Sequence, residues 1–183
     1  MTSPDSVSGD ERLRLFCALR LPDDVLDALE AWQHEHLRDG RIVPREHLHL
    51  TLAFLGRRPA TELPSIAASL ADAAREAAEI VFTPRRYRET RNVGMLVLDD
   101  PTEEAGRLAG RLFEGLEELG VYEREKRRWL PHVTVLRFRK QPRLDPPLPP
   151  LAPFSPSDAA VYHSRLRPSG AQYDVLESVA LGG

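Results

Sequence analysis

Two short segments repeat one pattern of chemically useful side chains, a histidine followed two residues later by a threonine. They are residues 49–52 (HLTL) and 132–135 (HVTV). In a β-strand, residues i and i+2 point to the same side, so His49 faces with Thr51 and His132 faces with Thr134, while the aliphatic neighbours face the core. An imidazole can exchange a proton, and a hydroxyl can donate to an anionic oxygen. Two such pairs across a groove would be sufficient for phosphodiester hydrolysis without a metal.

One such pair alone would carry little information, because partly buried histidines and strand threonines are both common. Two copies at similar points of the two half-chains favour a functional site. His47 lies on the same side as His49 and raises the alternative of a metal site. No Asp, Glu or Cys lies nearby at ligand spacing on that side, because Glu46 points the other way. We therefore interpret His47 as an edge residue and expect no metal and no cofactor.

Hydrophobic periodicity and turn signals predict the elements that must position these residues. Alternating apolar residues predict strands over 12–19, 48–55 and 131–138, and two shorter strands over 80–82 and 93–98. Helical spacing with terminal signals predicts helices from Asp23 toward Gly40, from Pro64 to Ala78, and from about residue 100 to Gly120. Two final strands over 159–166 and 173–181 are joined by a turn at Pro168-Ser169-Gly170. This order predicts an α/β or α+β fold with substantial antiparallel pairing.

Composition bounds the class of protein. The 183 residues are 42% hydrophobic and 29% charged, which fits one folded domain and excludes a disordered chain. We treat residues 1–183 as a single domain, with residues 1–12 expected to be disordered and the proline-rich segment 141–156 expected to be an extended connector. The apolar stretch Leu52–Leu55 is far too short to cross a bilayer. The polar N-terminus does not resemble a secretory signal, so we expect a cytoplasmic protein without a membrane partner.

The single cysteine, Cys17, excludes an internal disulfide framework and a cysteine-rich zinc site. Covalent catalysis also lacks support. Cys17 lies in an apolar strand, and no serine occupies a tight glycine-flanked turn.

Basic charge is clustered although the net charge is −3. Arginines concentrate in residues 85–91 and 121–143, and arginine favours forked contacts with phosphate. A genome rich in G and C is an alternative explanation for the arginine excess, but it does not explain the clustering. The run from Arg124 to Arg128 leads into the second motif, so it forms either a rim of the cleft or a solvated loop. Trp129 and Phe54 are either surfaces for base stacking or, as we favour, core residues.

Four blocks of this sequence, in order, resemble the 2H phosphoesterase superfamily, specifically the RNA 2′,3′-cyclic phosphodiesterases historically called 2′-5′ RNA ligases. The blocks span nearly the whole chain: residues 14–22 (RLFCALRLP), 43–56 (VPREHLHLTLAFLG), 129–137 (WLPHVTVLR), and 162–166 with 170–173 (YHSRL and GAQY). One departure is minor, because Val135-Leu136 stands where Leu-Ala is more usual and both pairs are apolar.

The resemblance implies a bilobal α+β fold in which two related lobes, with antiparallel-rich sheets, form a central cleft. It implies metal-independent opening of a 2′,3′-cyclic phosphate at an RNA end, leaving a 2′-phosphate, by a protein we expect to be monomeric. By the same resemblance His49 is the proton donor, His132 is the proton acceptor, and Thr51 and Thr134 bind the phosphate. Arg137 would also contact the phosphate.

Strict alternation, however, points Arg137 away from the cleft, because it follows His132 by five residues. Arg137 reaches the phosphate only if the strand bulges or ends near Leu136.

Two alternative functions stay open. The same site could act on another 2′-linked phosphate, such as a 2′-5′ oligonucleotide, a cyclic nucleotide or an ADP-ribose cyclic phosphate, because the motifs recognise phosphate and not the base. The chain could also be a non-catalytic RNA-binding module with a basic groove, although two intact histidines argue against that. Reverse ligation of RNA halves is chemically allowed, and the sequence does not decide it.

Overall fold

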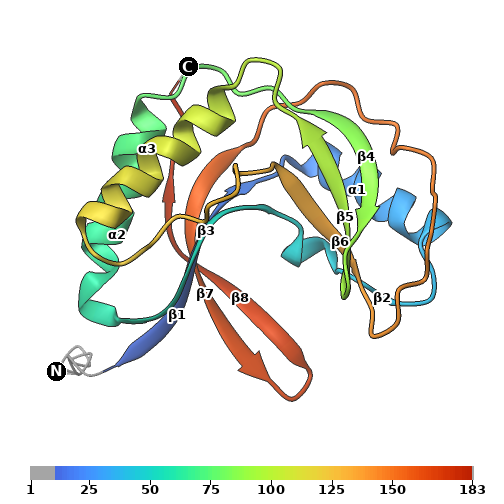
Figure 1. Cartoon of the computed structure of the whole chain (residues 1–183), viewed down its shortest axis with the longest axis horizontal. Coiled ribbons are helices and arrows are strands. Elements are labelled where there is room, and N and C mark those ends of the chain that lie inside the picture. Colours follow the sequence, from blue (N-terminus) through green and yellow to red (C-terminus); the bar gives the residue numbers. More distant parts are fainter. Residues whose placement is uncertain (1–10, 183) are drawn as a thin grey trace, which may run out of the picture.

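The computed structural model describes residues 11–182 and shows two four-stranded sheets beside each other (Figure 1). All pairings between neighbouring strands in both sheets are antiparallel. The first sheet contains, in spatial order, β3 (Leu50–Pro59), β1 (Arg12–Arg20), β7 (Asp158–Arg167) and β8 (Gly170–Val179). The second sheet contains β2 (Arg41–Ile42), β6 (His132–Arg137), β5 (Val93–Asp99) and β4 (Thr83–Glu89). This arrangement confirms the predicted α+β fold class.

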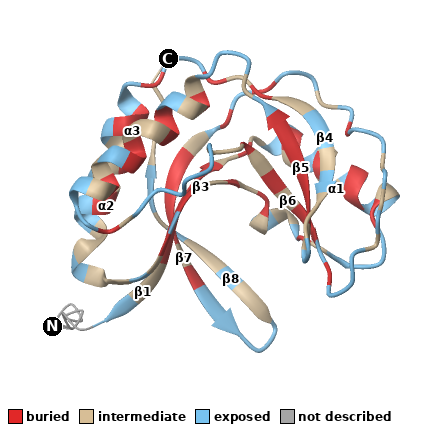
Figure 2. Ribbon diagram, in the orientation of Figure 1, coloured by how far each residue is buried: buried red, intermediate tan, exposed pale blue. Residues whose placement is uncertain are grey.

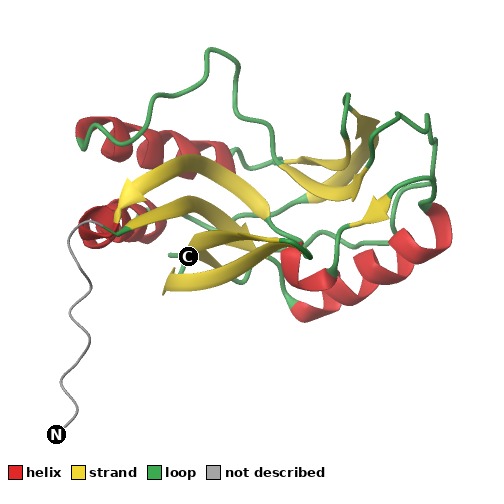
Figure 3. Ribbon diagram, turned by 90° about the horizontal axis from the view of Figure 1, so that it is seen from below, coloured by secondary structure: helices red, strands yellow, loops and turns green. Residues whose placement is uncertain are grey.

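Three α-helices cover the sheets from outside. Helices α2 (Leu63–Arg75) and α3 (Glu104–Glu118) pack together beside the first sheet, and α1 (Asp23–His36) lies beside the second (Figures 1 and 3). Two short 3₁₀ helices, η1 (Arg45–His47) and η2 (Ala60–Glu62), flank β3. The helices cross between the sheets. Helix α1 follows a strand of the first sheet but lies beside the second, and α3 follows a strand of the second sheet but packs beside the first.

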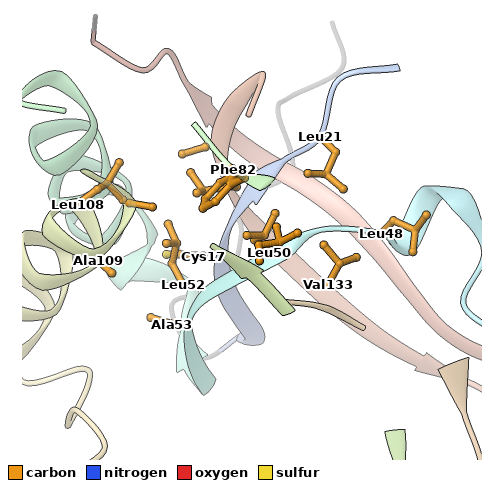
Figure 4. Packing of buried hydrophobic residues seen from close by; sticks show 14 of the residues in the cluster. Cys17, Leu21, Leu48, Leu50, Leu52, Ala53, Phe82, Leu108, Ala109 and Val133 are labelled. Carbon is orange, nitrogen blue, oxygen red and sulfur yellow. The ribbon is translucent and has the colours of Figure 1, made fainter. Parts of the chain in front are cut away.

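One continuous apolar core joins the two sheets and the helices. The inward faces of the strands and helices are buried, and the end of the β7–β8 hairpin is more exposed (Figure 2). Leu50 and Leu52 of β3, Val133 of β6, and Leu108 of α3 belong to the same cluster (Figure 4). Both motif strands are thus anchored through the same core, which fixes their side chains on the opposite face.

The proline-rich segment 141–156 contains no helix and no named strand, with one isolated bridge from Phe154 to Phe82. The Trp32 indole N–H donates to the carbonyl oxygen of Pro147 at 2.7 Å, which ties this connector to α1. Across residues 11–182, no helix is both long enough and apolar enough to cross a membrane.

Most predicted elements are confirmed, and several details differ. The strand expected at 80–82 is instead β4, whose exposed positions carry arginines that obscured its alternation. The two-residue β2 was missed. Helix α1 ends at His36, before Gly40, and α3 ends at Glu118, before Gly120. Of the segment 1–12 expected to be disordered, residues 1–10 lie outside the described residues, and Arg12 already opens β1.

Candidate active site

The two motifs lie at the starts of β3 and β6. His49 immediately precedes β3, whereas His132 is the first residue of β6. Leu48, Leu50 and Leu52 are buried around the first motif, and Val133 and Val135 are buried around the second. The histidines and threonines are only partly buried. Alternation therefore acts as predicted, and each histidine shares the open face with its threonine.

Both imidazole rings are oriented by the same local contact. The Nδ1 atom of His49 lies 2.8 Å from the carbonyl oxygen of His47, and that of His132 lies 2.8 Å from the carbonyl oxygen of Leu130. A carbonyl oxygen only accepts, so each Nδ1 carries the proton and donates it. In the neutral rings, Nε2 is therefore the free basic atom. The Nε2 of His49 lies 3.1 Å from the Thr51 hydroxyl oxygen, which donates to it.

An aromatic cluster surrounds His49. Its ring centroid lies 5.0 Å from that of Phe16, 5.6 Å from that of Tyr173 and 5.9 Å from that of Tyr162. Burial among these rings lowers the pKa of His49 to about 4, and the hydrogen bond to the His47 carbonyl only partly opposes the shift. His49 is therefore neutral in the free protein at pH 7.

The positive charges of His47, His132 and Arg137 also lower the pKa of His49. The two motif histidines, although far apart in the sequence, are thus within electrostatic reach of each other. A second link joins the two motif segments, because the Trp129 indole N–H donates to the Thr51 carbonyl oxygen at 3.1 Å.

A cavity of about 660 Å³ lies over these residues, a size that suits a nucleotide. Of the predicted site residues, His49, Thr51, Thr134 and Arg137 line its wall. His132 is not part of that wall, and lies two residues before Thr134 at the start of β6. The wall is completed by residues of both sheets, including Arg14 and Phe16 from β1, Arg41 and Ile42 from β2, and Ser164 and Tyr173 from the β7–β8 hairpin.

Strand β6 bulges next to Thr134. Thr134 pairs with Met95 and Leu136 pairs with Gly94, so Val135 is an extra residue without an opposite partner on β5. Val135 and Leu136 are consequently both buried, and Arg137 returns to the open side that carries Thr134. The structure therefore meets the condition under which Arg137 enters the cleft.

The bulge is held by a buried side chain from α1. Gln33 is fully buried, and its Nε2 donates to the carbonyl oxygens of Val135 at 2.9 Å and Val43 at 3.0 Å. The Val135 carbonyl also accepts from the Val43 backbone N–H at 3.1 Å. Gln33 thus supplies a hydrogen-bond donor to the Val135 carbonyl oxygen, which the bulge removes from regular strand pairing.

Comparison with known proteins decides the family. Residues 21–166 match the model of the 2′-5′ RNA ligase superfamily. The chain is also 36% identical to a Thermus thermophilus protein named RNA 2′,3′-cyclic phosphodiesterase, over 93% of this chain and 91% of the relative. The chain belongs to the 2′-5′ RNA ligase superfamily. This confirms the family that the sequence blocks indicate.

Solved members of the superfamily have the same fold. The apo form of Escherichia coli LigT superposes with a TM-score of 0.81 at 26% identity, covering 95% of this chain and all of LigT. LigT complexed with NADP⁺ gives a TM-score of 0.80, also at 26% identity and with the same coverage. LigT therefore has a nucleotide-bound structure.

Four wall residues of this superfamily member were missed or misinterpreted from the sequence. His47 is not an edge residue, because it lines the cavity with its ring centroid 4.4 Å from that of Tyr173. The sequence favours Phe54 as a core residue, yet Phe54 is 49% exposed and lines the cavity wall. The alternation of β1 already placed Arg14 away from the core, which was a usable signal. Arg41 offered no such signal, because β2 is two residues long.

The basic run before the second motif does not reach the cavity. Arg124 binds Glu117 through both guanidinium arms, Arg127 pairs with Glu125, and Arg128 lies 3.7 Å from Glu103. Of the two alternatives for this run, the structure favours the solvated loop, because none of its residues lines the cavity and its arginines contact acidic side chains. Trp129 is partly buried against the core, as favoured. Among residues 11–182, no three side chains of the His, Cys, Asp or Glu type converge as a metal site would require.

Proposed function

We propose that the protein hydrolyses the 2′,3′-cyclic phosphate at RNA ends to a 2′-phosphate by metal-independent acid–base catalysis. The observation that carries this proposal is the pair of imidazoles whose Nδ1 atoms are fixed by carbonyl oxygens. They accompany a single cavity that is lined by His49, the two motif threonines and Arg137. The activity named for the Thermus relative supports the same substrate.

In the proposed reaction, His132 accepts a proton from water through Nε2 while the water oxygen attacks phosphorus. The bond between phosphorus and the ribose 3′-oxygen breaks, and His49 donates a proton from Nε2 to that oxygen. The products are a 2′-phosphate monoester and a free 3′-hydroxyl, so atoms and protons balance. Thr51, Thr134 and Arg137 donate hydrogen bonds to the non-bridging oxygens, whose charge grows in the transition state.

To act as the proton donor, His49 must be protonated when the substrate is bound. Its pKa of about 4 leaves the ring neutral in the free protein near pH 7. A bound phosphate anion beside Nε2 stabilises the imidazolium and raises this pKa, and Arg137 opposes that effect. Substrate binding is therefore expected to be coupled to proton uptake by His49. The aromatic cluster strengthens this coupling, because it excludes the water that would otherwise screen the two charges.

The deciding experiment uses a short RNA that ends in a 2′,3′-cyclic phosphate, incubated with the protein in the presence of a chelator. We expect turnover, with phosphate retained on the 2′-hydroxyl of the product. Retention on the 3′-hydroxyl would contradict the assignment of the leaving oxygen, and strict metal dependence would contradict the two-histidine scheme. Binding of the RNA without turnover would favour the non-catalytic alternative. A panel of 2′-5′ oligonucleotide, cyclic nucleotide and ADP-ribose cyclic phosphate, compared by kcat/KM, would rank the substrates.

A further inference from the structure

The open face of the first sheet carries a second row of polar side chains beyond the motif threonine. Three successive cross-strand pairs of β3 and β1 share this face: Thr51 with Ala18, Phe54 with Phe16, and Arg57 with Arg14. Arg14 lines the cavity, whereas Arg57 is exposed outside its wall. A strand rises ~3.3 Å per residue, so the Cα of Arg14 lies roughly 13 Å along β1 from that of Ala18. The arginine row therefore lies beyond the residues proposed to hold the cyclic phosphate.

Strand β7 adds a hydroxyl to this row. Leu15 pairs with His163, so the next residues of the two strands, Arg14 and Ser164, both turn to the opposite face and line the cavity. Among residues 11–182, only Gln33 and Ser164 are buried polar residues, and Ser164 is 7% exposed. Gln33 uses its amide within the fold, whereas the Ser164 hydroxyl lies at the cavity wall, where it can donate to an anionic oxygen.

The guanidinium of Arg14 is held by a ring and not by a carboxylate. Its carbon lies 4.9 Å from the Phe54 ring centroid, over the row that separates Arg14 from Thr51. Its Nε is buried and has no hydrogen-bond partner among the described residues. Among residues 11–182, no carboxylate forms a salt bridge with Arg14, whereas Glu117 binds Arg124. Arg14 therefore keeps its donors for a ligand.

The pairing of Arg14 with Arg57 also favours an anion at this row. Like charges directly opposite each other destabilise a pair of strands, and these two arginines are such a pair on the open face. A bound anion would remove their repulsion and would accept hydrogen bonds from Arg14 and Ser164. The anion expected here is a phosphate, because the planar fork of a guanidinium matches phosphate oxygens.

We propose that Arg14 and Ser164 form a second anion subsite, which binds the phosphate on the 5′-oxygen of the terminal nucleotide. The inference rests on the proposed function, because it assumes that Thr51, Thr134 and Arg137 hold the cyclic phosphate of that nucleotide. In an RNA, the second phosphate is the diester that joins the last nucleotide to the preceding one. The subsite therefore selects polynucleotide ends and 5′-phosphorylated nucleotides over nucleoside cyclic phosphates.

The test adds one phosphate to a small substrate. Adenosine 2′,3′-cyclic phosphate, which has a free 5′-hydroxyl, is compared with the same compound phosphorylated at the 5′-oxygen. For the unaltered protein, we expect KM to be roughly 10- to 100-fold lower for the 5′-phosphorylated compound, with little change in kcat, because this phosphate does not react. Arg14→Gln should abolish the difference and leave KM for the 5′-hydroxyl compound nearly unchanged. Ser164→Ala should reduce the difference by roughly 2- to 10-fold.

Arg86→Gln is the matched control, because it removes the same charge from an exposed arginine of β4 outside the cavity wall. It should leave the KM ratio of the two compounds unchanged. An equal loss of the ratio in Arg86→Gln would overturn the inference, since the advantage would then come from overall charge. Equal KM values for the two compounds with the unaltered protein would overturn it as well. So would an equal rise of KM for both compounds in Arg14→Gln, because the substitution would then act at the cyclic phosphate.

A binding measurement separates this inference from the proposed function. Adenosine 2′,5′-bisphosphate and adenosine 2′-phosphate carry the 2′-phosphate of the product with and without the second phosphate. Calorimetric titration of the unaltered protein should give a Kd roughly 10- to 100-fold lower for the bisphosphate, and Arg14→Gln should bind the two ligands about equally. If the protein hydrolyses no cyclic phosphate, the proposed function fails, while this comparison still decides the subsite. Turnover of RNA ends combined with equal Kd values for the two ligands would reject the subsite in an active enzyme.

Discussion

Strands β3 and β6 present the same arrangement of side chains in different surroundings. In both, a carbonyl two residues earlier orients the histidine, the threonine shares its face, and an extra residue then turns a longer side chain into the cavity. In β3, the histidine lies among Phe16, Tyr162 and Tyr173, and the longer side chain is Phe54. In β6, no aromatic ring pairs with His132 among the described residues, and the longer side chain is Arg137.

This difference separates what the two motifs share from what their neighbours add. The carbonyl contact that orients each imidazole is the same in both copies. The environment is set by neighbouring strands, and it differs because only β3 lies beside the aromatic side chains of β1 and the β7–β8 hairpin. The following predictions test whether substitutions in the two motif strands have different effects.

The largest effect is expected from removing either imidazole. His49→Ala and His132→Ala should each lower kcat by roughly 10²- to 10⁴-fold, because each removes one proton-transfer group. The measurement is steady-state hydrolysis of an RNA with a cyclic phosphate end. His36→Ala provides the control, because His36 lies on α1 outside the cavity wall. Retained turnover in His132→Ala would contradict its assignment as the proton acceptor.

Arg137→Ala should have the next largest effect, a loss of about 10²-fold in kcat/KM, because it removes a donor to the transition-state oxygens. The loss should be similar for base-bearing substrates and for glycerol 1,2-cyclic phosphate. A loss confined to one of the two kinds of substrate would contradict a role for Arg137 at the phosphate.

The acid stability of the protein should report the burial of His49. Its pKa falls from 6.5 to about 4 on folding. Between these values the unfolded chain binds a proton that the folded protein does not, so stability is complete above pH 6.5 and falls as the pH drops toward 4. The contribution is roughly 3 kcal/mol at 1.36 kcal/mol per pKa unit.

Urea unfolding from pH 7 to pH 4 measures this contribution. The unaltered protein should lose stability more steeply than His49→Leu, since the contributions of other histidines cancel between the two. Parallel curves would mean that His49 is not desolvated in the folded protein.

The smallest effect is expected at Gln33, which holds the bulge in β6. Gln33→Leu removes two buried hydrogen bonds and leaves the carbonyl oxygen of Val135 with its single bond to Val43, so unfolding should be easier by roughly 1–3 kcal/mol. The variant should also raise KM, because Arg137 loses its fixed direction. In an Arg137→Ala background this second effect should disappear. An unchanged effect on KM in that background would show that Gln33 acts on the fold alone.

Local physics made much of this protein predictable from its sequence. Alternation with period two placed His49 with Thr51 and His132 with Thr134, because the pleat of a strand leaves no other choice once the aliphatic residues are buried. Apolar residues at helical spacing predicted the three helices, and a turn signal at residues 168–170 predicted the final hairpin.

Only the tertiary structure decided where the arginines act and which way the residues after each motif point. The basic run from Arg124 is engaged by acidic side chains, whereas Arg14 and Arg41 reach the cavity from strands of different sheets. The bulges after Thr51 and Thr134 depend on pairing with β1 and β5 and, in β6, on the buried amide of Gln33. A sequence pattern shows that side chains alternate along a strand. An extra residue at a bulge reverses which face the following side chains occupy, and the position of the bulge depends on partner strands distant in the chain.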